Sequence, residues 1–193
     1  MTKVAARRLI RQRVAQLTPD ERRAKSERIA DLVLSLPEVA DARVVMVFLS
    51  LPDEVDTGPL IAGLWKRGKV VAVPHTDLGE GTLVPVRLRP GAGLRRAALD
   101  VLEPEVDEVV PVADIDVVVV PGRAFDCEGH RLGRGKGFYD RFLGLKECRA
   151  LRLAVGYGCQ VLEVVPHGPH DVPVDVVVTE DGVLRVSGHR AEE

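Results

Sequence analysis

The residue types best suited to chemistry gather in one stretch, residues 131–140, which reads Arg-Leu-Gly-Arg-Gly-Lys-Gly-Phe-Tyr-Asp. Glycine adopts positive φ and lets a ligand approach the main chain, and successive amides in such a loop form an anion-binding concavity. The stretch lies directly between a predicted apolar strand and a predicted helix, whose first amides also favour an anion. We call residues 133–137 the glycine loop and predict that it holds a polyanion, with nucleotide phosphates as the favoured occupant. The members of the loop and the cation before it are Arg131, Gly133, Arg134, Gly135, Lys136 and Gly137.

Two familiar phosphate motifs do not fit this stretch. A P-loop would need glycine at position 130 and Ser or Thr at position 137, where His130 and Gly137 stand. The dinucleotide fingerprint GxGxxG fails as well, because the glycines here run GxGxG. A flexible surface loop remains the alternative interpretation. The position between strand and helix favours the anion site, but residue types alone do not identify the anion.

Other candidate residues lie far from the glycine loop in sequence. Lys3 and Arg7 are one turn apart beside an apolar stripe on a helix predicted over residues 3–16, so their side chains either pack along its edge or reach a phosphate. Glu54 follows the carboxyl end of a strand predicted over residues 44–49, which is where ligands bind in open α/β sheets. His167, His170 and Asp171 form either a zinc site or an ordinary polar turn.

The hydrophobic pattern predicts the elements that position these residues. Apolar runs over residues 44–49, 69–74, 116–120, 151–157 and 174–179 predict strands. Helices are expected over residues 3–16, 19–36, 138–145 and from Asp56 or Thr57, as caps, to Gly68, with Pro37 ending the second helix. Residues 83–88 suit an edge strand, residues 76–112 are hard to interpret, and residues 187–193 suit a frayed tail. We therefore predict an α/β fold in three layers, with a mostly parallel sheet and helices on both faces, forming a single domain over residues 1–193.

Composition excludes several classes of protein. The net charge of −2 and the 4% aromatic content argue against a nucleic-acid partner. Three cysteines without a CxxC pattern indicate a reducing compartment and argue against a disulfide framework or a zinc site, and Cys127 is expected to be a plain loop thiol. No apolar run is long enough to span a membrane and no secretory signal is evident. We expect a cytoplasmic monomer.

Four segments together resemble the 5-formyltetrahydrofolate cyclo-ligase family. They are RLGRGKGFYDRFL preceded by PGRAFD and Gly129, the Lys3-x-x-x-Arg7 pair, FLSLPDEVDT at residues 48–57, and HDVPVDVVVTE at residues 170–180. The resemblance implies a three-layer fold and ATP- and Mg²⁺-dependent conversion of 5-formyltetrahydrofolate to 5,10-methenyltetrahydrofolate. Residues 76–112 depart most from the family pattern, so no site residue is placed there, and part of the pterin pocket wall is their expected role. The family commonly has Tyr where Phe138 stands here, so this chain loses one hydroxyl group while keeping an aromatic wall.

The resemblance also implies roles for individual residues. Arg134 and Lys136 are the expected catalytic residues, and Asp140 with Asp171 the expected magnesium ligands. The expected ATP-binding residues are Lys3, Arg7, Arg131, Leu132, Gly133, Arg134, Gly135, Lys136, Gly137, Phe138 and Tyr139. The expected folate-binding residues are Leu49, Glu54, Arg134, Gly135, Lys136, Gly137 and Phe138. Two alternatives stay open, which are an ATP-dependent ligase or kinase acting on another small acid and a nucleotide- or folate-binding relative without turnover.

Overall fold

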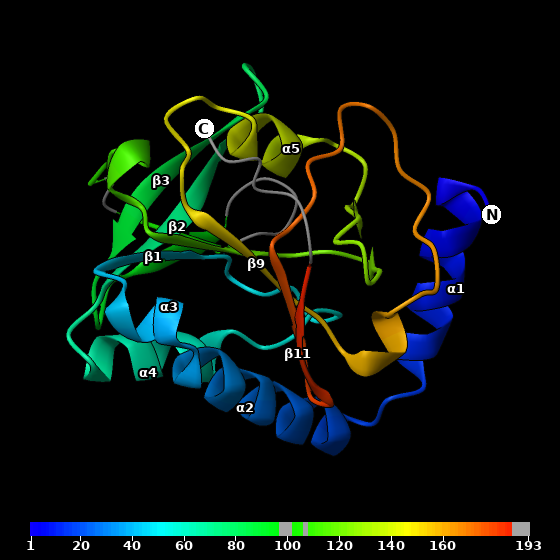
Figure 1. The fold of residues 1–193 in the computed structure, drawn as a ribbon. Helices are drawn as coiled ribbons and strands as arrows, with labels where there is room; N and C mark the ends of the chain where they lie inside the picture. The colour runs from blue at the N-terminus through cyan, green and yellow to red at the C-terminus, as the bar shows by residue number, and fades with distance from the viewer. Residues whose placement is uncertain (97–101, 106–107, 187–193) are drawn as a thin grey trace.

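The computed structural model describes residues 1–96, 102–105 and 108–186. Its centre is a seven-stranded sheet with the order β11-β10-β9-β6-β1-β2-β3. The five inner strands run parallel to one another, while β11 and β3 are antiparallel edge strands. The mostly parallel sheet predicted from the apolar runs is therefore confirmed (Figure 1). The strands are β1 (Val44–Val47), β2 (Val70–Asp77), β3 (Thr82–Leu88), β6 (Val117–Val120), β9 (Leu151–Val155), β10 (Val176–Thr179) and β11 (Gly182–Arg185).

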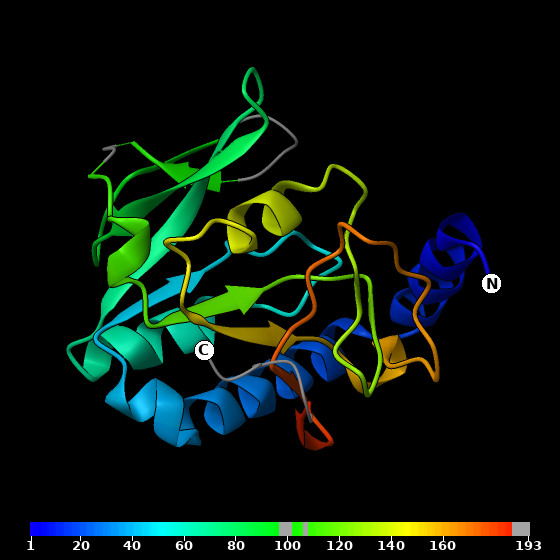
Figure 2. The same cartoon turned by 45° about the horizontal axis from the view of Figure 1, so that its top comes forward.

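Helices cover both faces of the sheet, as predicted. On one face α2 (Pro19–Ser35) and α4 (Gly58–Lys66) bury their apolar stripes, and α3 (Pro37–Asp41) follows α2. Helix α1 (Lys3–Ala15) joins the same core through Ala6, Ile10 and Val14, and it packs against residues 124–125 and 158–160 beside the sheet. On the other face lies the short α5 (Phe138–Leu143), opposite α2 and α4 in Figure 2. Alternate residues of β6 serve the two cores, since Val117 and Val119 belong to the first and Val118 and Val120 to the second. All four are buried, which explains the uninterrupted valine run of a central strand.

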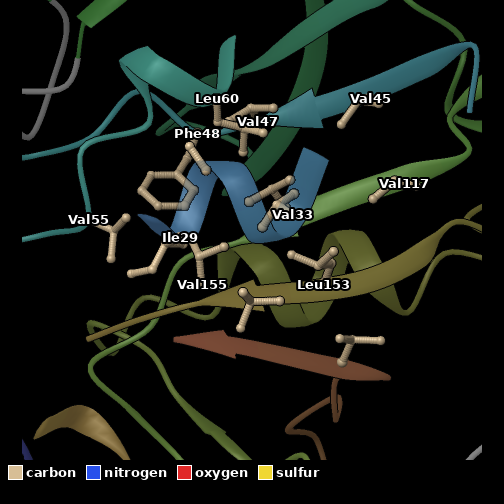
Figure 3. Packing of buried hydrophobic residues seen from close by; sticks show 14 of the residues in the cluster. Ile29, Val33, Val45, Val47, Phe48, Val55, Leu60, Val117, Leu153 and Val155 are labelled. Atoms are coloured by element: carbon tan, nitrogen blue, oxygen red, sulfur yellow. The ribbon is translucent and has the colours of Figure 1, made fainter. Parts of the chain in front are cut away.

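The first core is built mainly by α2 against the strands. Figure 3 shows Ile29 and Val33 of α2 among strand side chains that include Val47 and Val155. The helix begins with a capping box, in which the Thr18 hydroxyl accepts from the Glu21 amide and the Glu21 carboxylate accepts from the Thr18 amide. This cap fixes where α2 starts and therefore which of its faces meets the sheet.

Several predicted boundaries differ from the structure. Pro37 does not simply end a helix: α2 stops at Ser35 and Pro37 occupies the first turn of α3, where a missing amide costs nothing. Thr57 is the N-cap residue of α4, but its hydroxyl donates to the Phe48 carbonyl oxygen at 2.7 Å instead of capping. The helix after the glycine loop ends at Leu143, two residues earlier than predicted. The suggested tail at residues 187–193 lies outside the described residues.

The glycine loop does not directly follow the central strand, contrary to the prediction. A small antiparallel hairpin of β7 (Ala124–Phe125) and β8 (Arg131–Leu132) stands between β6 and the loop. A second small sheet pairs β4 (Leu94–Arg96) with β5 (Leu102–Pro104), beside β2 and β3. Among the described residues, no helix is both long and apolar enough to cross a membrane.

Candidate active site

A cavity of about 620 Å³ opens where the carboxyl ends of β1 and β6 meet the glycine loop. Crevices at this edge of an α/β sheet are the usual ligand sites of such folds. The cavity brings together every site residue predicted from the sequence. Its walls include Lys3, Arg7, Leu49, Glu54, Arg131, Leu132, Gly133, Arg134, Gly135, Lys136, Gly137, Phe138, Tyr139, Asp140 and Asp171.

Glycine is required by the backbone at two of the three loop positions. Gly135 has a φ of 106° and Gly137 a φ of 69°, both in the left-handed region that residues with side chains disfavour. Gly133 does not show positive φ, so at that position only the predicted close approach of a ligand to the main chain stays as a reason for glycine. Arg134, Gly135 and Lys136 are exposed, and they present cations and main chain toward solvent at the mouth of the cavity. This arrangement suits an incoming polyanion.

Helix α1 docks directly on the glycine loop. The Nε of Arg7 donates to the Gly133 carbonyl oxygen at 2.9 Å, and a Cβ added to Gly135 would lie 3.4 Å from Arg7 Nη2. Lys3 forms an ion pair with Asp171 on the segment that leads to β10. Both cations of the first helix therefore face the cavity, rather than only packing along the edge of the apolar stripe.

Two carboxylates of the cavity are paired with cations from this chain. The Nη2 of Arg131, a buried side chain, lies 2.7 Å from Asp140 Oδ1, which also accepts from the Val172 amide at 3.2 Å. Burial acts to raise the pKa of Asp171, but the Lys3 ammonium and the Gly168 amide outweigh burial and hold the pKa below its usual range. Asp171 is therefore an ionised oxygen donor at neutral pH.

The donor set of Asp140 and Asp171 suits a magnesium ion. Both carboxylates line one cavity, and the amide bound by Asp140 belongs to the residue next to Asp171. Mg²⁺ is commonly held by one or two carboxylates together with water and phosphate oxygens. Among the described residues, no three His, Cys, Asp or Glu side chains come together as a metal site. Two carboxylates facing a space for phosphates are therefore consistent with magnesium.

The zinc interpretation of the histidines finds no support in the described residues. His167 stacks on His130 with ring centroids 3.5 Å apart, and His130 Nδ1 lies 3.1 Å from Asp126 Oδ2. The nearly parallel rings join the segment after β9 to the β7–β8 hairpin. These histidines stabilise the segment that carries Asp171. Cys127 is exposed in the turn of the same hairpin and does not line the cavity.

Arg134 of the glycine loop pairs with an acidic segment after β1. Its Nε lies 3.0 Å from Glu54 Oε1, and its Nη2 lies 2.6 Å from Asp53 Oδ1. The other oxygen of Glu54 accepts from the Leu51 amide at 3.0 Å. Glu54 thus faces the cavity from the predicted position past the strand end, and the structure adds Asp53 as a second partner of Arg134, which sequence reasoning missed.

Two aromatic residues follow the glycine loop and line the cavity. The guanidinium carbon of Arg141 lies 5.3 Å from the centre of the Phe138 ring, and that of Arg131 lies 5.9 Å from the Tyr139 ring. The Tyr139 hydroxyl is buried and has no hydrogen-bond partner among the described residues. Burial and the nearby Glu54 charge raise the pKa of Tyr139, so its hydroxyl stays protonated and available as a donor.

The cavity also contains residues that sequence reasoning did not assign. Thr76 and Leu83 confirm that part of residues 76–112 forms a cavity wall, and the Thr76 amide donates to buried Glu103 at 2.9 Å. Most of the remaining unassigned wall residues lie just past the ends of strands, and that position is the sequence signal that could have identified them. The unassigned wall residues are Phe48, Leu51, Pro74, Thr76, Leu83, Pro121 and Gly122.

Comparison with known proteins shows the family to which the chain is similar. The sequence model of the 5-formyltetrahydrofolate cyclo-ligase family matches residues 1–180. A 5-formyltetrahydrofolate cyclo-ligase of Escherichia coli is 36% identical over 179 residues, covering 91% of this chain and 98% of the relative, and one of Mus musculus is 30% identical over 139 residues, covering 66% and 68%.

Solved structures show the same fold. The structure of a 5,10-methenyltetrahydrofolate synthetase from Aquifex aeolicus is 36% identical, with a TM-score of 0.84 and coverage of 100% of this chain and 97% of that chain. A 5,10-methenyltetrahydrofolate synthetase from Mycoplasma pneumoniae, at 20% identity and a TM-score of 0.75, shares the fold, with coverage of 93% and 99%.

Proposed function

The chain belongs to the 5-formyltetrahydrofolate cyclo-ligase family, and from that premise we propose that it converts 5-formyltetrahydrofolate to 5,10-methenyltetrahydrofolate with ATP and Mg²⁺, releasing ADP and phosphate. One observation carries the proposal: a single cavity combines the cationic glycine loop with two paired carboxylates and Glu54. That combination offers separate places for a triphosphate and for a polar heterocycle. We expect a single domain over residues 1–193 acting as a cytoplasmic monomer.

The chemical difficulty is the formamide of the substrate. Its carbonyl carbon is a poor electrophile and its oxygen a poor leaving group. Transfer of the γ-phosphoryl group to the formyl oxygen breaks the bond between the γ-phosphorus and its bridging oxygen, releases ADP and gives an iminium phosphate. The 10-nitrogen then attacks the activated carbon and loses its proton, and the ring closes. Cleavage of the carbon–oxygen bond releases phosphate and leaves the methenyl product.

The protein mainly positions reactants and neutralises charge in such a transfer. Lys136 and Arg134 are exposed cations at the mouth of the cavity, and we assign them to the migrating phosphoryl group. The main chain of the glycine loop holds the other phosphates, and Lys3 and Arg7 approach them from α1. Their cationic groups stabilise the negative charge that is spread over the phosphoryl oxygens in the transition state.

Asp140 and Asp171 would hold Mg²⁺, which when bound supplies positive charge to the phosphate oxygens. In the structure these carboxylates are neutralised by Arg131 and Lys3. With Mg²⁺ on the two carboxylates, Arg131 and Lys3 would be available to bind phosphate oxygens. Arg131 is buried, so its guanidinium keeps a fixed orientation toward the cavity.

Glu54, Leu49, Phe138 and Tyr139 form the proposed folate side of the cavity. Glu54 accepts hydrogen bonds from the pterin or from the reacting end of the substrate. The Tyr139 hydroxyl is a donor with no acceptor among the residues that the structure describes, and a bound substrate would satisfy it. Phe138 supplies an apolar wall at a position where a tyrosine would add a second hydroxyl group.

The direct test is to mix the protein with 5-formyltetrahydrofolate, ATP and MgCl₂ and to follow the near-ultraviolet absorbance of the methenyl product. Product that requires both ATP and MgCl₂ supports the proposal. ATP hydrolysis that depends on a different small acid would favour the ligase or kinase alternative. Binding of nucleotide and folate without product would identify a relative that has lost turnover. Light scattering after size exclusion tests the expected monomer.

A further inference from the structure

Only two of the three guanidinium nitrogens of Arg134 contact acceptors among the described residues. Its Nη2 contacts Asp53 Oδ1 at 2.6 Å and Glu54 Oε1 at 2.9 Å, and its Nε donates to Glu54 Oε1 at 3.0 Å. No described residue accepts a hydrogen bond from Nη1. A guanidinium fixed along one edge presents its remaining donors in a defined direction, which is how arginine orients itself toward phosphate.

The two carboxylates that hold Arg134 differ in their access to the cavity. Glu54 lines it, whereas Asp53 does not. Both oxygens of Glu54 already have partners, because Oε1 faces Arg134 and Oε2 accepts from the Leu51 amide. Because Oε1 already faces both Nε and Nη2 of Arg134, a substrate that hydrogen-bonds to Oε1 competes with the arginine for that oxygen. Asp53 does not line the cavity, so such a substrate leaves the contact between Asp53 and Arg134 in place.

Asp53 is itself anchored to a rigid part of the fold. Its Oδ2 contacts the Nη1 of Arg123, whose amide donates to the Leu132 carbonyl at 2.7 Å. The carbonyl of Arg123 accepts from buried Gln160 at 3.0 Å. Burial acts to raise the pKa of Asp53, but Arg123 and Arg134 outweigh burial and hold the pKa below its usual range. Asp53 is thus an ionised carboxylate between two guanidiniums, one fixed and one on the exposed glycine loop.

We propose that Asp53 is a positioning residue, which keeps Arg134 aimed at the migrating phosphoryl group once the substrate has taken Glu54. This inference rests on the proposed function, since it takes Arg134 to act on that group. Asp53 touches neither reactant and acts only through the arginine. Because Asp53 also contacts the fixed side chain of Arg123, it restrains Arg134, which belongs to a loop that has two glycines with positive φ.

The test combines kinetics with a readout that does not need turnover. Asp53→Asn keeps an acceptor oxygen and removes the charge. We expect kcat to fall about 10- to 100-fold, the scale of a misplaced catalytic group, with the KM for folate changed less than about twofold. We expect Asp53→Glu to recover part of kcat. In nuclear magnetic resonance spectra, the Arg134 Nη2–H protons, which face Asp53, should exchange with water several-fold faster in Asp53→Asn than in the wild type.

Two further variants make the result specific. Glu38→Gln removes a comparable arginine contact, with Arg185, on residues that do not line the cavity, and it should leave kcat unchanged. Arg134→Lys lacks the planar fork, so adding Asp53→Asn to it should lower kcat by much less than in the wild type.

The proposal is overturned if Asp53→Asn keeps kcat within about twofold of the wild type, or if its effect is the same in the Arg134→Lys background. Unchanged exchange of the Arg134 Nη2–H protons would also overturn it. These outcomes differ from failure of the proposed function, in which the wild-type protein itself makes no methenyl product. In that event the exchange measurement still decides whether Asp53 holds Arg134 in place.

Discussion

Arg7 donates a 2.9 Å hydrogen bond from its Nε to the carbonyl oxygen of Gly133, across 126 residues of sequence. The contact joins the first helix to the glycine loop at the mouth of the cavity. It leaves the terminal nitrogens of Arg7 beside Gly135, where a Cβ would meet Nη2 at 3.4 Å. Helix α1 therefore both shapes the loop and contributes charge to it.

Removal of this side chain tests the contribution of α1. Arg7→Ala should raise the KM for ATP about tenfold, because a hydrogen bond to a charged group contributes about 1.5–3 kcal/mol and each 1.4 kcal/mol is a factor of ten. Arg8→Ala is the matched control, since Arg8 is the exposed neighbour on the same helix and does not line the cavity. Steady-state kinetics at varied ATP would check it, and equal KM values for the two variants would contradict it.

Lys136 tests the role of the glycine loop in turnover. Lys136→Ala should lower kcat by about 100-fold or more, because removing one donor aimed at the negative charge that develops in a transition state typically costs about 100- to 1,000-fold in kcat. The fold should be unchanged, since the side chain is exposed. Circular dichroism melting and initial rates measure the two effects separately. Lys146→Ala, an exposed lysine that does not line the cavity, is the control, and a Lys136→Ala enzyme with near-normal kcat would remove this residue from the mechanism.

Asp140 tests the proposed magnesium site. Asp140→Asn should raise the MgCl₂ concentration for half-maximal rate at least about tenfold, because an amide oxygen is a weaker ligand than a carboxylate for a hard cation. The variant also leaves buried Arg131 without its charged partner, so the melting temperature should fall. Asp20→Asn, at an exposed position away from the cavity, should leave the magnesium titration unchanged. A magnesium titration identical to that of the wild type would argue against ligation by Asp140.

The Lys3–Asp171 pair predicts a pH dependence of stability. The folded-state pKa of Asp171 is lowered, so its contribution is fully present above the pKa of an unfolded aspartate, about 3.9, and is lost as the pH falls through the folded value. The difference in free energy of unfolding between the wild type and Asp171→Asn should stay constant from about pH 7 to 5 and shrink below about pH 4. Urea titrations at several pH values would measure it.

A second variant assigns that pH dependence to the ion pair. Lys3→Gln removes the cation that lowers the pKa of Asp171, and it should weaken the same acid-dependent loss of stability. A difference between the wild type and Asp171→Asn that persists unchanged to about pH 3 would contradict the assignment, because the carboxylate would then contribute nothing through its charge.

Much of the site follows from local sequence. The valine run of β6 predicted a buried central strand, because only a strand covered on both faces is apolar at every position. Glu54 was predicted at the cavity because it follows a strand end. The glycines and cations of residues 133–137 indicated an anion site through residue type alone. Each of these signals depends on a few adjacent residues, and their backbone preferences do not need distant partners.

The tertiary structure alone decided which charges meet. Arg131, predicted to hold phosphate, pairs with Asp140 through its buried side chain, and the β7–β8 hairpin before the glycine loop brings it there. Asp53 gained its role from Arg123 and Arg134, which lie 70 and 81 residues away in sequence. The order of strands in the sheet determines which charged side chains lie close together, and that order depends on how whole elements pack. The sequence by itself determined the chemistry available to this chain, whereas packing determined which partner each charged group has.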